Sequence, residues 1–361
     1  MWRFLPSEKR VITSMVESPR RTDAETADIY GMNVSTVASV RRRMLDAGAV
    51  YFVNVPSFHK LGCEMVAFHK GLLDPAVSNE VKTSNYIGFC ATSPEIFDAI
   101  IGAQSMVFMS VLESSAALDE LMLRHSRFFS GTKKASKATI STTVFPYGAS
   151  KGTYAPNFGP VVHRFFGLDT RKPRPRLPAM VEATALDLRE NEQRVLMALV
   201  EHPSAPDREL ASIVGLSRQA VTRIRHKLQD ENYYTFICVP RLYRWGFEIF
   251  SSVHVRFASD FAWSSRYNKQ PTEPIDYSFF TLQKADEAIA NHMIATFKEY
   301  TLGMETGLAW YHREKAFEKE PDVTLMSLEH CVEIKTFEFA SALRNLLDKG
   351  GRRRLPHRRN V

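Results

Sequence analysis

The first part of the chain carries apolar side chains at the spacing of amphipathic helices. In the segment SEKRVITSMVES the apolar residues share one helical face: Val11, Ile12, Met15 and Val16. Pro19 is expected to end this helix, and a second helix is expected to begin near Asp23, because aspartate caps free N–H groups. The second helix would turn Ala27 and Ile29 inward. Gly31 would end it in a left-handed turn.

A third helix is predicted for the segment NVSTVASVRRRMLD. Val37, Val40 and Met44 recur at helical spacing, so one face belongs to a core and the other is free. The β-rich run YFVNVP follows and fits the wing of a winged helix-turn-helix. Helix, helix, glycine turn, helix and strand are thus predicted in that order.

The same pattern returns in the second half of the chain. Aligning Ser7 with Asn191 lets the two segments run without a gap to Glu64 and Glu248. Identical matched residues include Glu8 and Glu192, Arg10 and Arg194, Pro19 and Pro203, Asp23 and Asp207, and Gly31 and Gly215. The apolar faces also agree, with Val195, Leu196, Leu199, Val200, Ala211, Ile213, Val221, Ile224 and Leu228 in the second copy. An ungapped match of this length indicates an internal duplication.

The free face of each third helix carries polar and basic side chains. In the first copy these are Ser35, Thr36, Ser39, Arg42 and Arg43, and in the second Arg218, Gln219, Thr222, Arg223, His226 and Lys227. Such side chains can hydrogen-bond base edges or phosphates from the major groove. An isolated basic run is more often a solvated surface. Its position on the last helix of both copies favours double-stranded DNA binding.

Strand and helix signals follow each module. After the first come MVAFHKGLL, YIGFCAT and SMVFMSVLES as strands, SSAALDELMLRHSRFF as a helix and ATISTTVFPY as a closing strand. In the second half FSSVHVRFA, DYSFFTLQ and FKEYTLGME are expected as strands, WYHREKAFEKE as a helix and HCVEIKTFEFA as a strand. This order suits a βαββαβ sandwich in each half. The fold class is therefore α+β.

Composition and charge fit this picture. The 361 residues are 44% hydrophobic and 24% charged, and the net charge of +7 favours a polyanionic partner. The basic run RKPRPR and the tail GRRRLPHRRN add to that charge. The N-terminus lacks a secretory signal, and no window approaches the ~18 apolar residues needed to span a bilayer. We expect a cytoplasmic protein without a membrane partner.

The sequence offers little catalytic chemistry. No nucleophilic triad, P-loop, dinucleotide-binding turn or H-E-x-x-H pattern occurs, so neither a cofactor nor a metal is expected, and the chain is predicted not to be an enzyme. The paired carboxylates Asp119 and Glu120, and Asp286 and Glu287, are expected on solvated helix faces. The cysteines are expected to be buried, reduced thiols: Cys63, Cys90, Cys238 and Cys331.

The helix-turn-helix segments AETADIYGMNVSTVASVRRRMLDAG and RELASIVGLSRQAVTRIRHKLQDEN resemble the Lrp/AsnC family of prokaryotic, especially archaeal, transcription regulators. The resemblance implies two winged helix-turn-helix domains, each followed by a ferredoxin-like (βαββαβ) effector and oligomerisation domain. The predicted domains are residues 1–60, 61–147, a linker at 148–186, 187–244, 245–348 and a basic tail at 349–361. No residues for an effector ligand can be placed, so its identity stays unknown.

The duplication implies an intramolecular pseudo-dimer with two recognition helices on one chain. Because the two free faces differ, we expect an operator with unequal half-sites. A homodimer of such chains is compatible with the exposed strand edges of the sandwiches.

Two alternatives remain open. Fused siroheme decarboxylases share the tandem architecture, and for such a tetrapyrrole-binding enzyme the candidate residues are His69, His254, His292 and Arg256. The other alternative is a redox or metal sensor that uses the cysteines or histidines.

Overall fold

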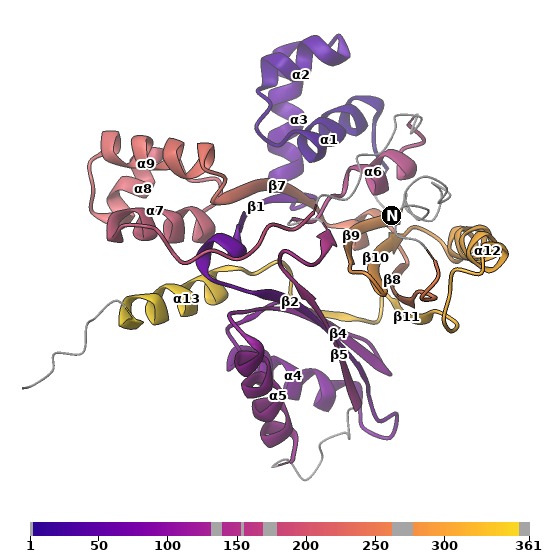
Figure 1. The fold of residues 1–361 in the computed structure, drawn as a ribbon. Coiled ribbons are helices and arrows are strands. Elements are labelled where there is room, and N and C mark those ends of the chain that lie inside the picture. The colour runs from indigo at the N-terminus through magenta and orange to yellow at the C-terminus, as the bar shows by residue number, and fades with distance from the viewer. Residues whose placement is uncertain (1–2, 131–138, 153–154, 169–178, 262–276, 354–361) are drawn as a thin grey trace, which may run out of the picture. The chain divides into compact units, whose positions relative to one another are not determined.

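The computed structural model describes residues 3–130, 139–152, 155–168, 179–261 and 277–353 (Figure 1). The chain forms two compact units. The first contains Met1–Val53, Ala149–Met180 and Phe236–His330, and the second contains Asn54–Gly148, Val181–Thr235 and Cys331–Val361. Each unit therefore combines the three-helix module of one half with the sheet of the other half. The basic run RKPRPR lies outside the described residues.

The two three-helix modules form as their patterns predict. The first consists of α1 (Pro6–Glu17), α2 (Asp23–Tyr30) and α3 (Val34–Asp46), and the second of α7 (Glu190–Glu201), α8 (Asp207–Val214) and α9 (Arg218–Asp230). The predicted apolar faces of the first and third helices are buried in both copies. Gly31 and Gly215 end the second helices with φ of 61° and 64°. Ile29 and Ile213 are exposed, which corrects their predicted inward position.

The strands after the modules, β1 (Val50–Pro56) and β7 (Tyr234–Pro240), pair with each other in a two-stranded sheet. Within the first unit, Phe52 stacks on Phe236 with ring centroids 4.9 Å apart. Short helices follow each strand, η1 (Phe58–Leu61) and α10 (Leu242–Trp245). Trp245 Nε1 donates to the carbonyl of Ala49, which ties α10 to the end of the first module.

The second unit contains a five-stranded sheet in the order β12-β3-β4-β2-β5. Its elements are β2 (Met65–Leu72), α4 (Asn79–Ala91), β3 (Ile96–Ile101), β4 (Ser105–Leu112), α5 (Ser115–Ser130) and β5 (Thr139–Pro146). Neighbouring strands are antiparallel. Alternate residues of β2 and β4 pack under α4 and α5 in one core, which includes Ala67, Phe108 and Leu121. The elements from β2 to β5 follow the predicted βαββαβ order.

The first unit contains a second five-stranded sheet, in the order β11-β8-β10-β9-β6. Its elements are β8 (Ile249–Arg256), β9 (Ser278–Gln283), β10 (Glu287–Ile294), α12 (Phe297–Arg313) and β11 (Asp322–Ser327). The order β11-β8-β10-β9 matches that of β5-β2-β4-β3. Both halves of the duplication thus contain the same strand arrangement.

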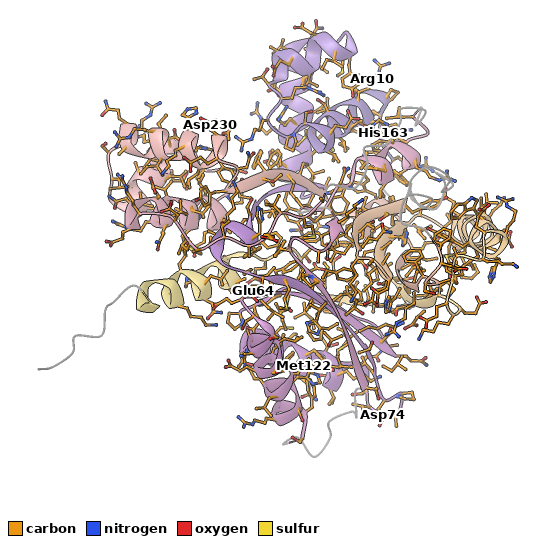
Figure 2. The ribbon with its side chains drawn as sticks, in the orientation of Figure 1. Arg10, Glu64, Asp74, Met122, His163 and Asp230 are labelled. Atoms are coloured by element: carbon orange, nitrogen blue, oxygen red, sulfur yellow. The ribbon has the colours of Figure 1, made fainter. Side chains whose placement is uncertain are left out.

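Part of the predicted linker is structured. Residues 148–186 include β6 (Lys151–Gly152), which pairs with β9, and α6 (Gly159–Phe165). On α6, His163 Nε2 lies 2.6 Å from the carboxylate of Glu17 on α1; Figure 2 labels this histidine. These contacts connect the linker to both the module and the sheet of the first unit.

Three local predictions are wrong. YIGFCAT was expected to be a strand but lies in α4, because Lys82, Tyr86, Phe89 and Cys90 repeat at helical spacing and are buried. FKEYTLGME was also expected to be a strand and lies in α12, which buries Gly303, Gly307 and Trp310 at that same spacing. The third error is the placement of HCVEIK in the second sandwich. It forms β12 (Val332–Lys335), which pairs with β3 in the other sheet.

The chain then runs from β12 into α13 (Ala340–Arg353), which includes the start of the predicted basic tail. Phe339 stacks on Phe97 of β3 with ring centroids 5.0 Å apart, and Arg344 forms an ion pair with Glu201 of α7. The C-terminal segment therefore contacts both the sheet and the three-helix module of the second unit. No helix within the described residues is long and apolar enough to cross a membrane.

Candidate functional site

The free face of α3 contains the side chains predicted to contact DNA in the first copy. Ser35, Thr36, Ser39 and Arg42 are all exposed. Arg43 is also exposed, but its Nη2 lies 2.7 Å from Oε1 of Glu8, so it is paired within the module. Arg43 thus has an internal partner that the sequence pattern does not predict.

The face of α9 also includes predicted side chains that have partners within the module. Arg218, Gln219, Arg223 and His226 are exposed. Thr222 is half-buried and donates to Asp207 Oδ2 at 2.6 Å, while Lys227 pairs with Glu192 Oε1 at 2.8 Å. Thr222 and Lys227 therefore have structural partners in this module.

One carboxylate organises each module. Glu8 accepts a hydrogen bond from the backbone N–H of Leu5 at 2.8 Å, and Glu192 accepts one from Arg189 at 2.9 Å. Although burial opposes ionisation of Glu192, hydrogen bonds from Lys227 and from the Arg189 N–H hold its pKa below the usual value. This glutamate both caps the first helix and anchors the third. Arg43 and Lys227, which match in the duplication, therefore form the same ion pair with the capping glutamate in both modules.

A second cluster of charged groups lies on the sheet of the first unit. His254 Nε2 is 2.7 Å from Glu287 Oε2, and Lys284 Nζ is 2.6 Å from Glu287 Oε1. Arg256 Nε lies 3.8 Å from the same carboxylate. Burial opposes ionisation of Glu287, yet the hydrogen bonds from His254 and Lys284 lower its pKa to about 2. A permanently ionised carboxylate therefore joins three basic side chains.

The strands determine which way these side chains point. Val255 and Phe257 pack with Trp310 of α12, so the alternating residues His254 and Arg256 lie on the sheet face turned away from α12. We call this the distal face. In the antiparallel register, Glu287 lies opposite Arg256.

Next to the charged cluster the distal face of the first unit is polar and closely packed. Asn291 of β10 and Thr324 of β11 both lie opposite Ser252 of β8. All three are buried, whereas the Arg256 side chain is 52% exposed. The accessible part of this face is therefore its charged end.

The corresponding face in the second unit is the side of the sheet turned away from α4 and α5, and we also call it distal. It is apolar, because Val66 lies opposite Val111 and Phe68 opposite Met109. All four are buried. The two copies thus share strand order but not distal-face chemistry.

The other two histidine candidates lie elsewhere. His69 is fully buried between Thr142 Oγ1 at 3.0 Å and Ser110 Oγ at 2.9 Å, and burial lowers its pKa to about 3. His292 lies opposite Ser251 in the register, on the face covered by α12, and burial lowers its pKa to about 4. Both are neutral at physiological pH. His254 and Arg256 are the two candidates that the structure brings together.

Sequence reasoning missed Glu287 and Lys284. Glu287 was expected on a solvated helix face with Asp286, but it begins strand β10 and is buried. The run from Glu287 to Asn291 alternates larger residues with alanine, which is a signal for a strand. Asp119 and Glu120 are exposed on α5, as expected.

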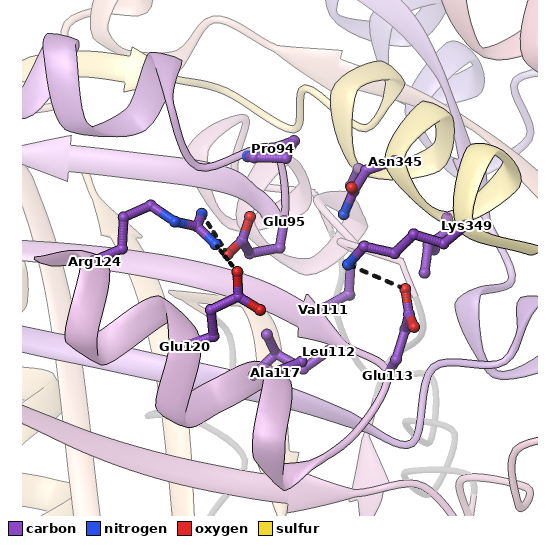
Figure 3. A pocket seen from close by; sticks show the side chains of 12 residues that line it. Pro94, Glu95, Val111, Leu112, Glu113, Ala117, Glu120, Arg124, Asn345 and Lys349 are labelled. Carbon is purple, nitrogen blue, oxygen red and sulfur yellow. Dashed lines mark hydrogen bonds and ion pairs between the residues drawn. The ribbon is translucent and has the colours of Figure 1, made fainter. Parts of the chain in front are cut away.

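A pocket of about 110 Å³ lies in the second unit, between α5, the ends of β3 and β4, and α13 (Figure 3). Arg124 contacts Glu95 at 2.9 Å and Glu120 at 3.5 Å, and Lys349 contacts Glu113 at 3.4 Å. Its basic groups are therefore already paired with lining carboxylates. The pocket shows no unpaired basic group to attract an anion.

The cysteines and candidate metal ligands form no site within the described residues. Cys63, Cys90 and Cys238 are buried, and burial raises the pKa of the Cys90 thiol to about 12. For the less buried Cys331, burial raises the thiol pKa to about 11. No group of three or more His, Cys, Asp or Glu side chains is placed to hold a metal ion in the part of the chain that the structure describes.

Comparison with solved structures identifies a fold that spans nearly the whole chain. The siroheme decarboxylase NirDL matches with a TM-score of 0.51 and 13% identity, over 95% of this chain and 99% of that one. The same protein with an iron-uroporphyrin III analogue matches with a TM-score of 0.50 and 12% identity, with the same coverage. The likeness shows the tandem fold alone. No family model and no curated protein matches the sequence.

The Lrp/AsnC resemblance is supported only coarsely. AsnC from E. coli matches 40% of this chain and 92% of its own, at 16% identity and a TM-score of 0.31. The prediction that the chain is not an enzyme is contradicted, because the structures that match its full length are those of an enzyme.

Proposed function

We propose that the chain is an enzyme of the siroheme decarboxylase type, which binds a tetrapyrrole bearing carboxylate side chains. The observation that carries the proposal is the cluster of His254, Lys284 and Arg256 around Glu287 on the distal face of the first unit. The fold it shares with a siroheme decarboxylase supports the choice of substrate class.

The cluster has the groups that recognition of a carboxylate requires. The half-exposed Arg256 contacts Glu287 only at 3.8 Å, which leaves guanidinium N–H donors for a ligand. Arginine binds carboxylates through two parallel hydrogen bonds. Lys284 adds a second positive charge beside it. One carboxylate against three basic groups leaves a site that favours an anion.

The cluster also has a group that can supply a proton. Loss of carbon dioxide from an acetate side chain leaves an electron pair on the methylene carbon, and a proton added there completes a methyl group. Imidazole is the side chain best suited to proton transfer near neutral pH. His254 Nε2 lies 2.7 Å from Oε2 of Glu287, and this contact fixes the position of the ring. We assign His254 as the proton donor.

Binding is tested by adding an iron uroporphyrin-type tetrapyrrole to the protein and recording the visible absorption spectrum. We expect a saturable change in the tetrapyrrole bands, which weakens about tenfold or more when Arg256→Leu removes the charge-assisted hydrogen bonds. An unchanged spectrum at every protein concentration refutes the proposal.

A second candidate function is double-stranded DNA binding through α3 and α9. The observation that favours it is that both helices expose polar and basic side chains outside the internal ion pairs, among them Arg42 on α3 and Arg223 on α9. Because the two faces differ, this proposal includes unequal half-sites and an internally duplicated pseudo-dimer.

DNA binding predicts a specific response to substitution. Replacing Arg42 and Arg223 with alanine should weaken binding and lower the slope of log affinity against log salt concentration by about one per lost phosphate contact. Fluorescence anisotropy with a duplex over a range of salt concentrations measures both. Glu190→Ala, on the exposed first turn of α7, is the control. Equal affinity and slope in the double variant would contradict this function.

A further inference from the structure

The duplication allows the two distal faces to be compared position by position. Through the alignment of β2 with β8, the residues Ser252, His254 and Arg256 correspond to Phe68, Lys70 and Leu72. In the first copy a phenylalanine therefore stands in place of the buried serine, and a leucine in place of the arginine. Lys70 is the basic residue of this set in the first copy.

The strands that pair with β8 and β2, which are β10 and β4, also differ in the polarity of their distal faces. Arg256 lies opposite Glu287, whereas Leu72 lies opposite Ser105. Ser252 lies opposite Asn291, whereas Phe68 lies opposite Met109. The first copy therefore has a serine, Ser105, at the position of the carboxylate that joins the basic groups in the second copy.

The role of Glu287 follows from its contacts. Its two oxygens contact different partners, His254 through Oε2 and Lys284 through Oε1, and Arg256 lies opposite it in the register. Glu287 is only 7% exposed, so the carboxylate is fixed by the sheet, whereas the Arg256 side chain is 52% exposed. Without the negative charge of Glu287, its basic partners would repel one another and would no longer be held in this arrangement.

We propose that Glu287 is the positioning residue of the tetrapyrrole site, and that its presence in one copy only limits each chain to one tetrapyrrole despite the duplication. This inference rests on the proposed function. The second distal face, with Lys70 among buried apolar residues, lacks the arrangement of charges that a ligand with several carboxylates requires.

The first test is stoichiometry. The chain is titrated at a protein concentration well above the dissociation constant with the iron uroporphyrin-type tetrapyrrole, and the visible bands are followed. We expect saturation at one equivalent per chain. Saturation at two equivalents overturns this inference while leaving the proposed function intact. Absence of any spectral change overturns both.

Matched variants then locate the site. Arg256→Leu and Glu287→Ser each introduce the residue found in the first copy, and each should weaken binding about tenfold or more, the size expected for losing hydrogen bonds to charged groups. Lys70→Ala is the control at the position equivalent to His254 and should change affinity less than about twofold. Weakening by Lys70→Ala as large as that by Arg256→Leu contradicts the inference.

Conservative substitutions of Glu287 distinguish two roles: positioning the basic side chains through its charge, or only stabilising the fold. Glu287→Asp keeps the charge on a shorter side chain and should restore part of the affinity lost in Glu287→Ser. Glu287→Gln keeps the size without the charge and should not. Equal affinities for the Asp, Gln and Ser variants, each folded by circular dichroism, would show that Glu287 does not act through its charge.

Discussion

At the residue scale, single carboxylates have roles that their sequence positions do not reveal. Glu8 and Glu192 match in the duplication, but the alignment alone does not show that each caps a helix and anchors a basic residue on the third helix. The sequence pattern places Arg43 on the same face as Arg42, and its ion pair with Glu8 becomes visible only in the structure. Spacing predicts which face a side chain occupies, whereas the choice between an internal partner and a ligand depends on neighbours distant in sequence.

This account predicts the effect of removing Glu192. Glu192→Ala deletes the cap at Arg189 and leaves Lys227 without its partner, so we expect the free energy of unfolding to fall by about 1–3 kcal/mol. Urea denaturation followed by circular dichroism measures it. Glu190→Ala removes an exposed glutamate from the same helix turn and serves as control. Equal stability of the two variants would show that the Glu192 network contributes nothing.

At the scale of helices and strands, the sequence predicted an element correctly where its apolar residues repeat with one clear period. Val37, Val40 and Met44 define α3 without ambiguity, and all three are buried. In α4, the run from Tyr86 to Cys90 is short and apolar, so it fits a strand as well as a helix. Its helical state is decided by packing against α5 in the core, where Phe89 contacts Phe129. Local patterns do not contain that information.

The pairing of β12 with β3 was also beyond local patterns. It brings Phe337 to Asp98, whose Oδ1 accepts the backbone N–H of Phe337 at 3.3 Å. Burial raises the pKa of Asp98 from 3.8 to about 7, and this hydrogen bond opposes the shift. A half-buried carboxyl group on β3, in contact with the C-terminal segment, is thus largely protonated below neutral pH.

The raised pKa of Asp98 predicts a pH dependence of stability. Because the folded protein binds this proton more tightly than the unfolded chain, the free energy of unfolding contributed by Asp98 falls as the pH rises from 3.8 to about 7. Asp98→Asn should remove this loss, so its melting temperature relative to the parent protein should be higher at pH ~8 than at pH ~5. Differential scanning calorimetry at both values measures the difference. A difference independent of pH would contradict the burial of an ionisable Asp98.

At the scale of the whole molecule, the duplication is visible in sequence, but the exchange of modules between units is not. The alignment of Ser7 with Asn191 shows two copies, and the simplest expectation places each module with the sheet that follows it. The structure instead combines the N-terminal module with the sheet of β8–β11 in one unit. Which of two similar sheets a module joins depends on contacts across the chain, such as that between Trp245 and Ala49.

Divergence between the copies is the main functional signal at this scale. The shared strand order preserves the fold, while the distal faces have become charged in one copy and apolar in the other. Sequence reasoning named His254 and Arg256 but missed Glu287, whose buried carboxylate makes them a site. The proposed function requires the charged distal face in one copy only.

The most direct test of the central claim is the fate of siroheme incubated with the purified chain, with the tetrapyrrole products identified by mass spectrometry. The account predicts time-dependent loss of carbon dioxide from siroheme, slowed strongly by His254→Ala and little by Lys70→Ala. Recovery of unchanged siroheme at every protein concentration, from protein that has bound it, would contradict decarboxylation as the function of this chain.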